Sequence, residues 1–318
     1  MLPRTTLKHH AQAMVMVLTV NSFVNDRLKP VFSLSDKPTS YQGPKFMRGY
    51  LYVAAGKKYV CEAVRSAQSL RAVDKSAHIT LVTDHPFESD TFNQVIVQPT
   101  TAQTYKHGLL YKVQHLYNSS PYEETLFIDS DTYVCENIVR IFDLLEFFDV
   151  AIAPDPTDVN RPKSPRSAQR LRALDLYNTG VILFKKNERN DELFNRWLRI
   201  YNDKLENETL GKENDQTSFI EAWLESNSKI YVLSHAWNAR TPFFFTLNQS
   251  VKIIHGRHKD YEVIKERLNK PHHSRHRCWL PVHQKCVMKK SGWLYHTKTL
   301  GSQWKRRLLK TLKGASVT

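Results

Sequence analysis

The strongest constraint on the fold is a regular alternation of short apolar runs and amphipathic segments that begins near residue 48. In "KYVCEAVRSAQSLRAV" (58–73) the apolar residues recur at helical spacing, between the strand-like runs "GYLYVAAG" (49–56) and "HITLVTD" (78–84). The alternation predicts an α/β sheet with helices on both faces. Further strands are predicted at 93–98, 125–129, 149–155, 179–186, 229–238 and 251–255, and further helices at 108–120, 190–205 and 215–226.

Three of the predicted strands end on side chains that can bind ligands, namely Asp84, Asp129 and His255. In open α/β sheets, ligands collect beyond the carboxyl ends of the strands. The shared position predicts that these three residues contribute to one site.

The turn after the first strand, "AAGKKY" (54–59), contains a single glycine. A dinucleotide-binding domain would need G-x-G-x-x-G at this place, and the chain also lacks the G-x-x-x-x-G-K-[ST] phosphate loop and the G-x-S-x-G nucleophile elbow. Dehydrogenases, P-loop ATPases and ordinary α/β-hydrolases are therefore not the leading interpretations.

The segment "TLFIDSDTYV" (125–134) ends an apolar strand with two carboxylates, Asp129 and Asp131. Two like charges at short range are costly unless a positive charge lies between them. Hard oxygen ligands suit Mg²⁺ or Mn²⁺, which keep open positions for phosphate oxygens. The pair thus predicts a metal that bridges protein and diphosphate, and the alternative is two solvated acids at a strand end.

The composition favours an anionic partner. The chain has 318 residues and a formal net charge of +15, concentrated after residue 250, which fits nucleic acid, a membrane surface or a phosphate-bearing substrate. Four cysteines are too few for a disulfide scaffold of this size. Cys61 and Cys135 are expected to be buried thiols, and pairing of Cys278 with Cys286 stays open.

The two ends of the chain are expected to be extensions of a central domain at 46–265. The first, 1–45, holds the only candidate targeting segment (11–24), which is short for a membrane span, so no transmembrane span or signal peptide is predicted and the localisation stays open. The second, 266–318, is basic. Its amphipathic tail "GSQWKRRLLKTLKG" (301–314) could contact an anionic membrane peripherally or pack on the domain.

Four segments resemble those of nucleotide-sugar glycosyltransferases with the GT-A fold. "YKVQHLYNSSPYEETLFIDSDTYV" (111–134) resembles their helix, turn, apolar strand and D-x-D motif. "DLYNTGVILFKKN" (175–187), "ENDQTSFIEAW" (213–223) and the stretch from "AWNAR" to "VKIIHG" (236–256) resemble three later elements, in the family's order. The nearest relatives would be glycogenin-like, family-8-type enzymes, over about residues 48–260.

The resemblance implies a GT-A-type, Rossmann-like fold with a mixed, mainly parallel sheet. It also implies a metal-dependent hexosyltransferase that uses a nucleotide-diphosphate sugar, with a UDP-sugar expected, and retains the sugar's configuration. Asp129, Asp131 and His255 would hold Mn²⁺ or Mg²⁺. Where the family has H-x-x-G-x-x-K-P-W, this chain has "HGRHKDY" (255–261), which puts part of the phosphate site and the retention in doubt.

The same resemblance assigns roles to further residues. Those implied at the donor are Ala54, Ala55, Gly56, Tyr59, Asp84, Lys112, Ser130, Thr179 and Gly180. Those implied in catalysis are Asp215, Gln216 and Asn178, and those on the acceptor side are Trp237 and Asn238.

Several of these residues have simpler interpretations. Lys112 could be a solvated helix lysine, Asp84 could cap the turn before Pro86, and Trp237 could pack in the core. Asp215 could act as a helix N-cap, which is compatible with a sugar contact.

Two other functions compete with sugar transfer. A Mg²⁺-dependent nucleotidyltransferase would also use close carboxylates, but it would usually need a Gly-rich phosphate loop. A non-enzymatic protein that binds nucleic acid or an anionic membrane would rest on the net charge alone, and nucleic acid is not the expected partner. The acceptor is unknown, and the basic loop 155–172 hints that it is anionic.

Overall fold

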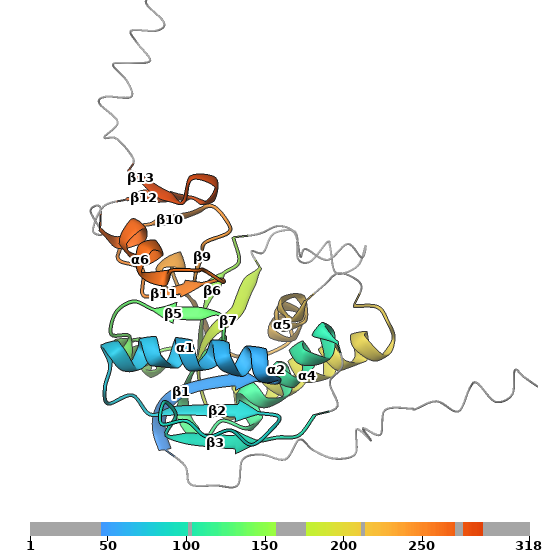
Figure 1. The fold of residues 1–318 in the computed structure, drawn as a ribbon. Helices are drawn as coiled ribbons and strands as arrows, with labels where there is room; N and C mark the ends of the chain where they lie inside the picture. The colour runs from blue at the N-terminus through green and yellow to red at the C-terminus, as the bar shows by residue number, and fades with distance from the viewer. Residues whose placement is uncertain (1–45, 101–103, 157–175, 211–213, 271–275, 289–318) are drawn as a thin grey trace, which may run out of the picture. The chain divides into compact units, whose positions relative to one another are not determined.

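The computed structural model describes residues 46–100, 104–156, 176–210, 214–270 and 276–288 (Figure 1). Every described residue belongs to one compact unit, which begins at residue 40. The targeting candidate and the basic tail lie outside the described residues, as does nearly all of the basic loop expected to bind the acceptor.

The described residues contain a seven-stranded central sheet in the order β3-β2-β1-β4-β7-β6-β8. All pairs in it are parallel except the two that involve β7, which runs antiparallel to β4 and to β6. The prediction of a mixed, mainly parallel sheet is confirmed. The strands are β1 (Phe46–Ala54), β2 (Ile79–Thr83), β3 (Gln94–Val97), β4 (Tyr122–Ile128), β6 (Val150–Pro154), β7 (Tyr177–Lys185) and β8 (Ile230–Val232).

Helices cover both faces of this sheet (Figure 1). α1 and the 3₁₀ segment η1 pack on one face, and α2, α4 and α5 pack on the other. The inner strands β2, β4, β6 and β7 are buried on both sides over most of their length, so they are almost continuously apolar rather than alternating. The segments are α1 (Lys57–Val73), η1 (Val139–Glu146), α2 (Tyr105–Asn118), α4 (Glu188–Glu206) and α5 (Asp215–Leu224).

Two small sheets complete the described part of the chain. One has the order β5-β11-β9 and the other β10-β12-β13, and a third apolar cluster joins the second of these to helix α6. The elements are β5 (Thr132–Val134), η2 (His235–Trp237), β9 (Ala239–Arg240), β10 (Phe245–Leu247), β11 (Ile253–His255), α6 (Tyr261–Asn269), β12 (Arg277–Leu280), η3 (Pro281–His283) and β13 (Lys285–Met288).

Part of the predicted C-terminal extension is folded with the rest of the unit. Helix α6 spans the boundary drawn at residue 265, and β12 pairs with β10. Trp279 of β12 is fully buried and donates a hydrogen bond from Nε1 to the backbone of Thr241. No helix among the described residues is both long and apolar enough to cross a membrane.

The cysteines are all free thiols. Cys135 is buried as expected, but the expectation for Cys61 was wrong, because it lies on the outer face of α1 between the buried Val60 and Ala63. In the β12–β13 hairpin, Cys286 stands opposite Trp279 rather than opposite Cys278.

Candidate active site

The two acids of the D-x-D motif lie in a tight turn that connects the central sheet to a small one. The backbone N–H of Asp129 donates to the carbonyl of Gly180 on β7 at 2.8 Å, and Thr132 Oγ1 donates to the carbonyl of Asp129 at 2.8 Å. The backbone N–H of Gly256 then donates to the carbonyl of Asp131 at 2.9 Å. These hydrogen bonds hold the turn between β4, which ends at residue 128, and β5, which begins at residue 132.

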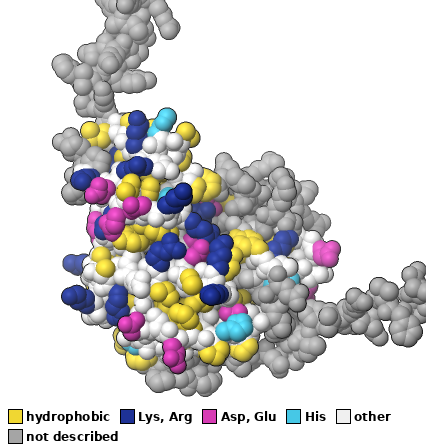
Figure 2. Space-filling view, in the orientation of Figure 1, with side chains coloured by type: hydrophobic (Ala, Val, Ile, Leu, Met, Phe, Trp, Pro, Cys, Tyr) yellow, Lys and Arg dark blue, Asp and Glu magenta, His cyan; other side chains and the backbone are white. Residues whose placement is uncertain are grey.

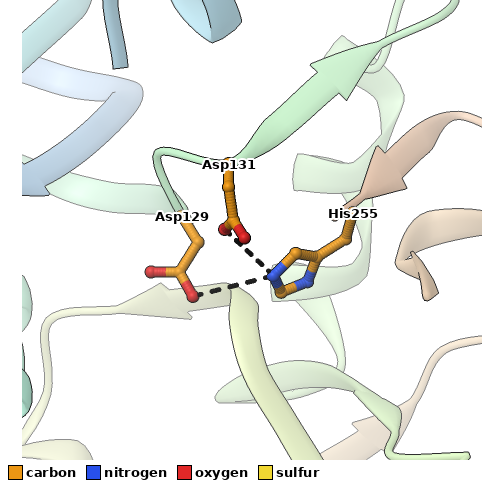
Figure 3. Close-up of side chains that lie close together, drawn as sticks. All are labelled: Asp129, Asp131 and His255. Atoms are coloured by element: carbon orange, nitrogen blue, oxygen red, sulfur yellow. Dashed lines mark ion pairs between the residues drawn. The ribbon is translucent and has the colours of Figure 1, made fainter. Parts of the chain in front are cut away.

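The bend brings both carboxylates to His255 (Figure 3). His255 Nε2 lies 3.3 Å from Asp131 Oδ1 and 4.0 Å from Asp129 Oδ2. One ligand atom from each of the three residues lies within 4.8 Å of the others. His255 does not end a strand of the central sheet, as the shared-edge argument implied; it comes from β11, which pairs antiparallel with β5.

Gly180 makes the position of the imidazole possible. A Cβ at this residue would lie 2.2 Å from His255 Cε1 and 2.7 Å from its Nδ1, far inside van der Waals contact. The structure therefore places Gly180 behind the histidine. Its predicted contact with the donor stays a prediction.

A chain of hydrogen bonds determines which nitrogen of His255 carries a proton. The Gly180 N–H donates to Asn178 Oδ1 at 3.1 Å, which identifies that atom as the amide oxygen. Asn238 Nδ2 donates to the same oxygen at 2.8 Å, so the other end of Asn238 is an acceptor. His255 Nδ1–H must then donate to Asn238 Oδ1 at 2.8 Å, which leaves Nε2 facing the two carboxylates.

This tautomer fits a metal site. An Nε2 lone pair beside two carboxylates needs a proton or a cation between them. Neutral imidazole and carboxylate oxygens together suit Mn²⁺, and a second hydrogen bond on the opposite ring nitrogen is the usual support of a metal-binding histidine. The three residues therefore fit the ion that the resemblance implied.

The two carboxylates differ electrostatically. Burial alone raises the pKa of Asp131, but the hydrogen bond from His255 and its charge outweigh it when a proton, rather than a metal ion, occupies Nε2. The guanidinium groups of Arg257 and Arg240 act in the same direction, so this pKa lies well below its usual range. Burial raises the pKa of Asp129, and nearby cations offset the effect only in part.

Lys112 connects the acids to a second buried carboxylate. Its Nζ lies 2.6 Å from Asp215 Oδ2 and 3.7 Å from Asp129 Oδ2. Thr179 Oγ1 donates to the same oxygen of Asp215 at 2.8 Å. Burial alone would lower the pKa of Lys112, but the two carboxylates outweigh it and raise the pKa, so the lysine is charged rather than a solvated helix residue.

A cavity of about 560 Å³ opens beside the acids. Ten of the residues predicted from the sequence line it, together with residues that were not predicted. Of the predicted donor and metal residues, the lining contains Ala54, Ala55, Gly56, Tyr59, Asp84, Lys112, Ser130, Asp129, Asp131 and His255.

Small residues at the end of β1 form part of the cavity lining. Gly56 has a φ of +84°, a conformation that favours glycine, and its N–H donates to Asp84 Oδ1 at 2.8 Å. Burial raises the pKa of Asp84, but the hydrogen bond from Gly56 and the contact with His85 outweigh it and lower the pKa. Asp84 thus holds the turn and also borders the cavity.

Other predicted residues lie behind the lining. Asp215, buried, begins α5, and Asn214 rather than Asp215 caps that helix. Gln216 Nε2 donates to Asp155 Oδ2 at 2.6 Å. Asn178 and Thr179 are buried on β7, and their roles in catalysis and donor binding stay predictions.

The two predicted acceptor residues do not line the cavity. Asn238 is fully buried and hydrogen bonds to His255, so it orients the imidazole. Trp237 is packed against the main apolar cluster, in agreement with its simpler interpretation.

Sequence reasoning missed Tyr105, Arg240 and Arg257, which also line the cavity. The position of Arg257, two residues after a predicted metal ligand, was a usable signal. No local pattern marks Arg240, because its place depends on the pairing of β9 with β11.

The chain was compared with known proteins. No protein-family model matches it, and no curated protein sequence matches it. Solved structures do match. Mouse xyloside xylosyltransferase 1 in its apo form is 15% identical, with 67% of this chain and 98% of that chain covered and a TM-score of 0.45.

Two further matches are also named as glycosyltransferases. The galactosyltransferase LgtC, in complex with donor and acceptor sugar analogs, is 13% identical, with 70% and 94% covered and a TM-score of 0.47. GlyE of Streptococcus pneumoniae TIGR4 is 13% identical, with 69% and 56% covered and a TM-score of 0.44. At these TM-scores the likeness carries no weight for the function of this chain.

Proposed function

We propose that this chain is a metal-dependent glycosyltransferase that moves a sugar from a nucleotide-diphosphate donor, a UDP-sugar, to an acceptor that is not identified. One observation carries the proposal. Asp129, Asp131 and His255 present three ligand atoms within 4.8 Å of one another at the wall of a cavity of about 560 Å³. A cavity of this volume is within the range of small-molecule sites.

The nucleoside of the donor would occupy the end of the cavity formed by Ala54, Ala55 and Gly56. Small residues there let a base or ribose approach the backbone closely. Tyr59, about one-third exposed, offers a ring on which a base can stack, and Asp84 offers carboxylate lone pairs to base or ribose.

Asp129, Asp131 and His255 would hold Mn²⁺ or Mg²⁺. When bound, such an ion acts as a Lewis acid that stabilises the charge on the departing diphosphate. Asn238 Oδ1 accepts a hydrogen bond from His255 Nδ1–H. This contact orients the ring so that Nε2 faces the position proposed for the ion.

Lys112 and Asp215 would position the sugar. Their ion pair is buried, and Thr179 fixes the carboxylate from the other side, so the pair has one geometry. Lys112 borders the cavity and supplies a fixed positive charge beside Asp129. Asp215 and Gln216 are proposed to act near the reacting carbon, with Asn178 supporting them, and retention of configuration is proposed on the resemblance alone.

Calorimetric titration with UDP tests this function. We expect binding only with Mn²⁺ or Mg²⁺ present, and loss of that binding in Asp131→Ala. A panel of UDP-sugars, screened for slow metal-dependent hydrolysis, would then identify the sugar. Metal-independent binding of UDP, or no binding by the wild-type chain, would refute the proposal.

A further inference from the structure

Two arginines that the proposed function does not use lie beside the metal-binding acids. Arg240 ends β9 and stands opposite His255 in the register of the β9–β11 pair. Arg257 follows His255 after Gly256, whose φ of +126° turns the chain back toward the acids. Both side chains line the cavity, and on the face seen in Figure 2 several Lys and Arg side chains surround acidic ones near the middle of the described surface.

The Arg240 guanidinium is close enough to Asp131 to lower the pKa of that carboxyl, but it makes no direct ion pair among the described residues. It forms no ion pair within 4.0 Å of a described carboxylate, and its buried Nε has no hydrogen-bond partner there. The guanidinium carbon lies over the ring of Phe243, at 5.5 Å from the ring centroid. A half-buried, unpaired guanidinium is costly, so this position favours an anion in the cavity.

The Arg257 guanidinium, in contrast, is paired with a carboxylate on each side. Its Nη1 lies 3.2 Å from Asp131 Oδ2, where it neutralises a metal-binding carboxylate. On its other side, Glu62 of α1 accepts from Nε at 2.7 Å and from Nη2 at 2.8 Å. Glu62 thus keeps the arginine at the cavity even if its contact with Asp131 is lost.

Two of the three cations that line the cavity already have a carboxylate partner outside the lining. Lys112 pairs with Asp215 at 2.6 Å and Arg257 pairs with Glu62 at 2.7 Å, whereas Arg240 has no ion pair within 4.0 Å of a described carboxylate. A divalent ion at Asp129 and Asp131 would add positive charge beside the two arginines, which makes an anion there more favourable. Guanidinium groups are suited to phosphate oxygens.

We propose that Arg240 and Arg257 bind the donor's diphosphate, and that Arg257 does so by exchanging Asp131 for a phosphate when the metal ion binds. This inference rests on the proposed function. It assigns the phosphate site to residues that the sequence left open, since the lysine of the family's ending is absent. It also means that Arg257 competes with the metal for Asp131 before the diphosphate arrives.

Because of this competition, replacing Arg257 should change the affinities for Mn²⁺ and for UDP in opposite directions. Calorimetry can measure the two affinities separately. In Arg257→Gln, Mn²⁺ alone should bind about 3–10-fold more tightly, because a competing cation is removed from Asp131. UDP with saturating Mn²⁺ should bind about 10–100-fold more weakly, because a charged hydrogen bond is lost. Arg240→Gln should weaken UDP binding by a similar factor without weakening Mn²⁺ binding, and Arg240→Lys should restore part of it.

Arg140→Ala is the matched control. Its removal changes the net charge by the same amount as the two glutamine variants. Because this arginine is 91% exposed and does not line the cavity, both affinities should stay unchanged. Wild-type UDP affinity in both glutamine variants would overturn the inference, and so would a loss of Mn²⁺ binding together with UDP binding. If the wild-type chain itself does not bind UDP with Mn²⁺, the proposed function fails, and this inference fails with it.

Discussion

Two aspartates, Asp149 and Asp131, differ in what surrounds their carboxylates. One is enclosed by hydrogen-bond donors of the protein, and the other borders a cavity. Asp149, before β6, is 1% exposed and accepts hydrogen bonds from Arg189 Nε and Nη2 at 2.8 and 2.7 Å. Asn187 Nδ2 and the backbone N–H of Lys229 donate to it at 2.9 Å each. Asp131 is 18% exposed, borders the cavity and shares His255 with a second carboxylate.

The difference separates a structural carboxylate from one suited to a ligand. Burial raises the pKa of Asp149, but the hydrogen bonds from Arg189 and from the backbone of Lys229 outweigh it, so its pKa lies below the usual range. Its oxygens are occupied by donors from three other residues of the chain, Asn187, Arg189 and Lys229. Asp131 also has a lowered pKa, but its partners are ones that a metal ion can replace or share.

The largest effect is expected from Asp131→Ala. The variant removes one ligand of the proposed metal, and losing Lewis-acid assistance costs several kcal/mol in the transition state. Metal-dependent hydrolysis of the UDP-sugar should fall by about 10³-fold or more. The melting temperature should change little, and a variant that keeps its activity would show that Asp131 binds no metal.

Asp149→Ala should give the reverse result. It leaves a buried set of donors without an acceptor, so the free energy of unfolding should fall by about 3 kcal/mol, measured by urea unfolding. Hydrolysis per folded molecule should stay as in the wild type, because Asp149 does not line the cavity. If Asp149→Ala instead lost its activity and kept its stability, Asp149 would not be a purely structural carboxylate, and the contrast with Asp131 would fail.

Asn238→Ala tests the support of the histidine. Without the acceptor for Nδ1–H, His255 loses its orientation, and Mn²⁺ affinity should fall about 10–100-fold. Asn238→Asp keeps an oxygen acceptor at this place and should recover part of that affinity. Equal Mn²⁺ affinities in both variants and the wild type would mean that Asn238 has only a packing role.

The smallest effect concerns acid stability. The pKa of Asp149 is lowered in the folded state, so its stabilisation is complete above its unfolded pKa of about 4 and is lost as the pH falls toward the folded pKa. Wild-type unfolding curves should therefore show falling stability below about pH 4. Asp149→Asn should have a flatter dependence in that range, and an unchanged slope would assign the acid sensitivity to other groups.

The central sheet and its helices could be predicted because their apolar residues repeat at simple periods. The helix at 58–73 and the strand at 125–129 were predicted within a few residues of α1 and β4. The antiparallel direction of β7 could not be derived from its residues, because a strand buried on both faces has the same apolar pattern in either direction.

The site was predicted in part. Asp129 and Asp131 follow a buried strand, and this local signal led to the proposed metal site. The hydrogen bond between His255 and Asn238 depends on which short strands pair, and so does the position of Arg240. Strand pairing is a non-local property, and no local sequence pattern indicates it here. Helix α6 was missed although Asp260 caps it and Tyr261, Ile264 and Leu268 have helical spacing.

The most direct test is a crystal of the chain soaked with Mn²⁺ and UDP, recorded at a wavelength that gives anomalous scattering from manganese. An anomalous peak in bonding contact with Asp129, Asp131 and His255 Nε2, next to the diphosphate, is the result expected here. Bound UDP with no manganese at these three residues, or with manganese held elsewhere, would contradict the account.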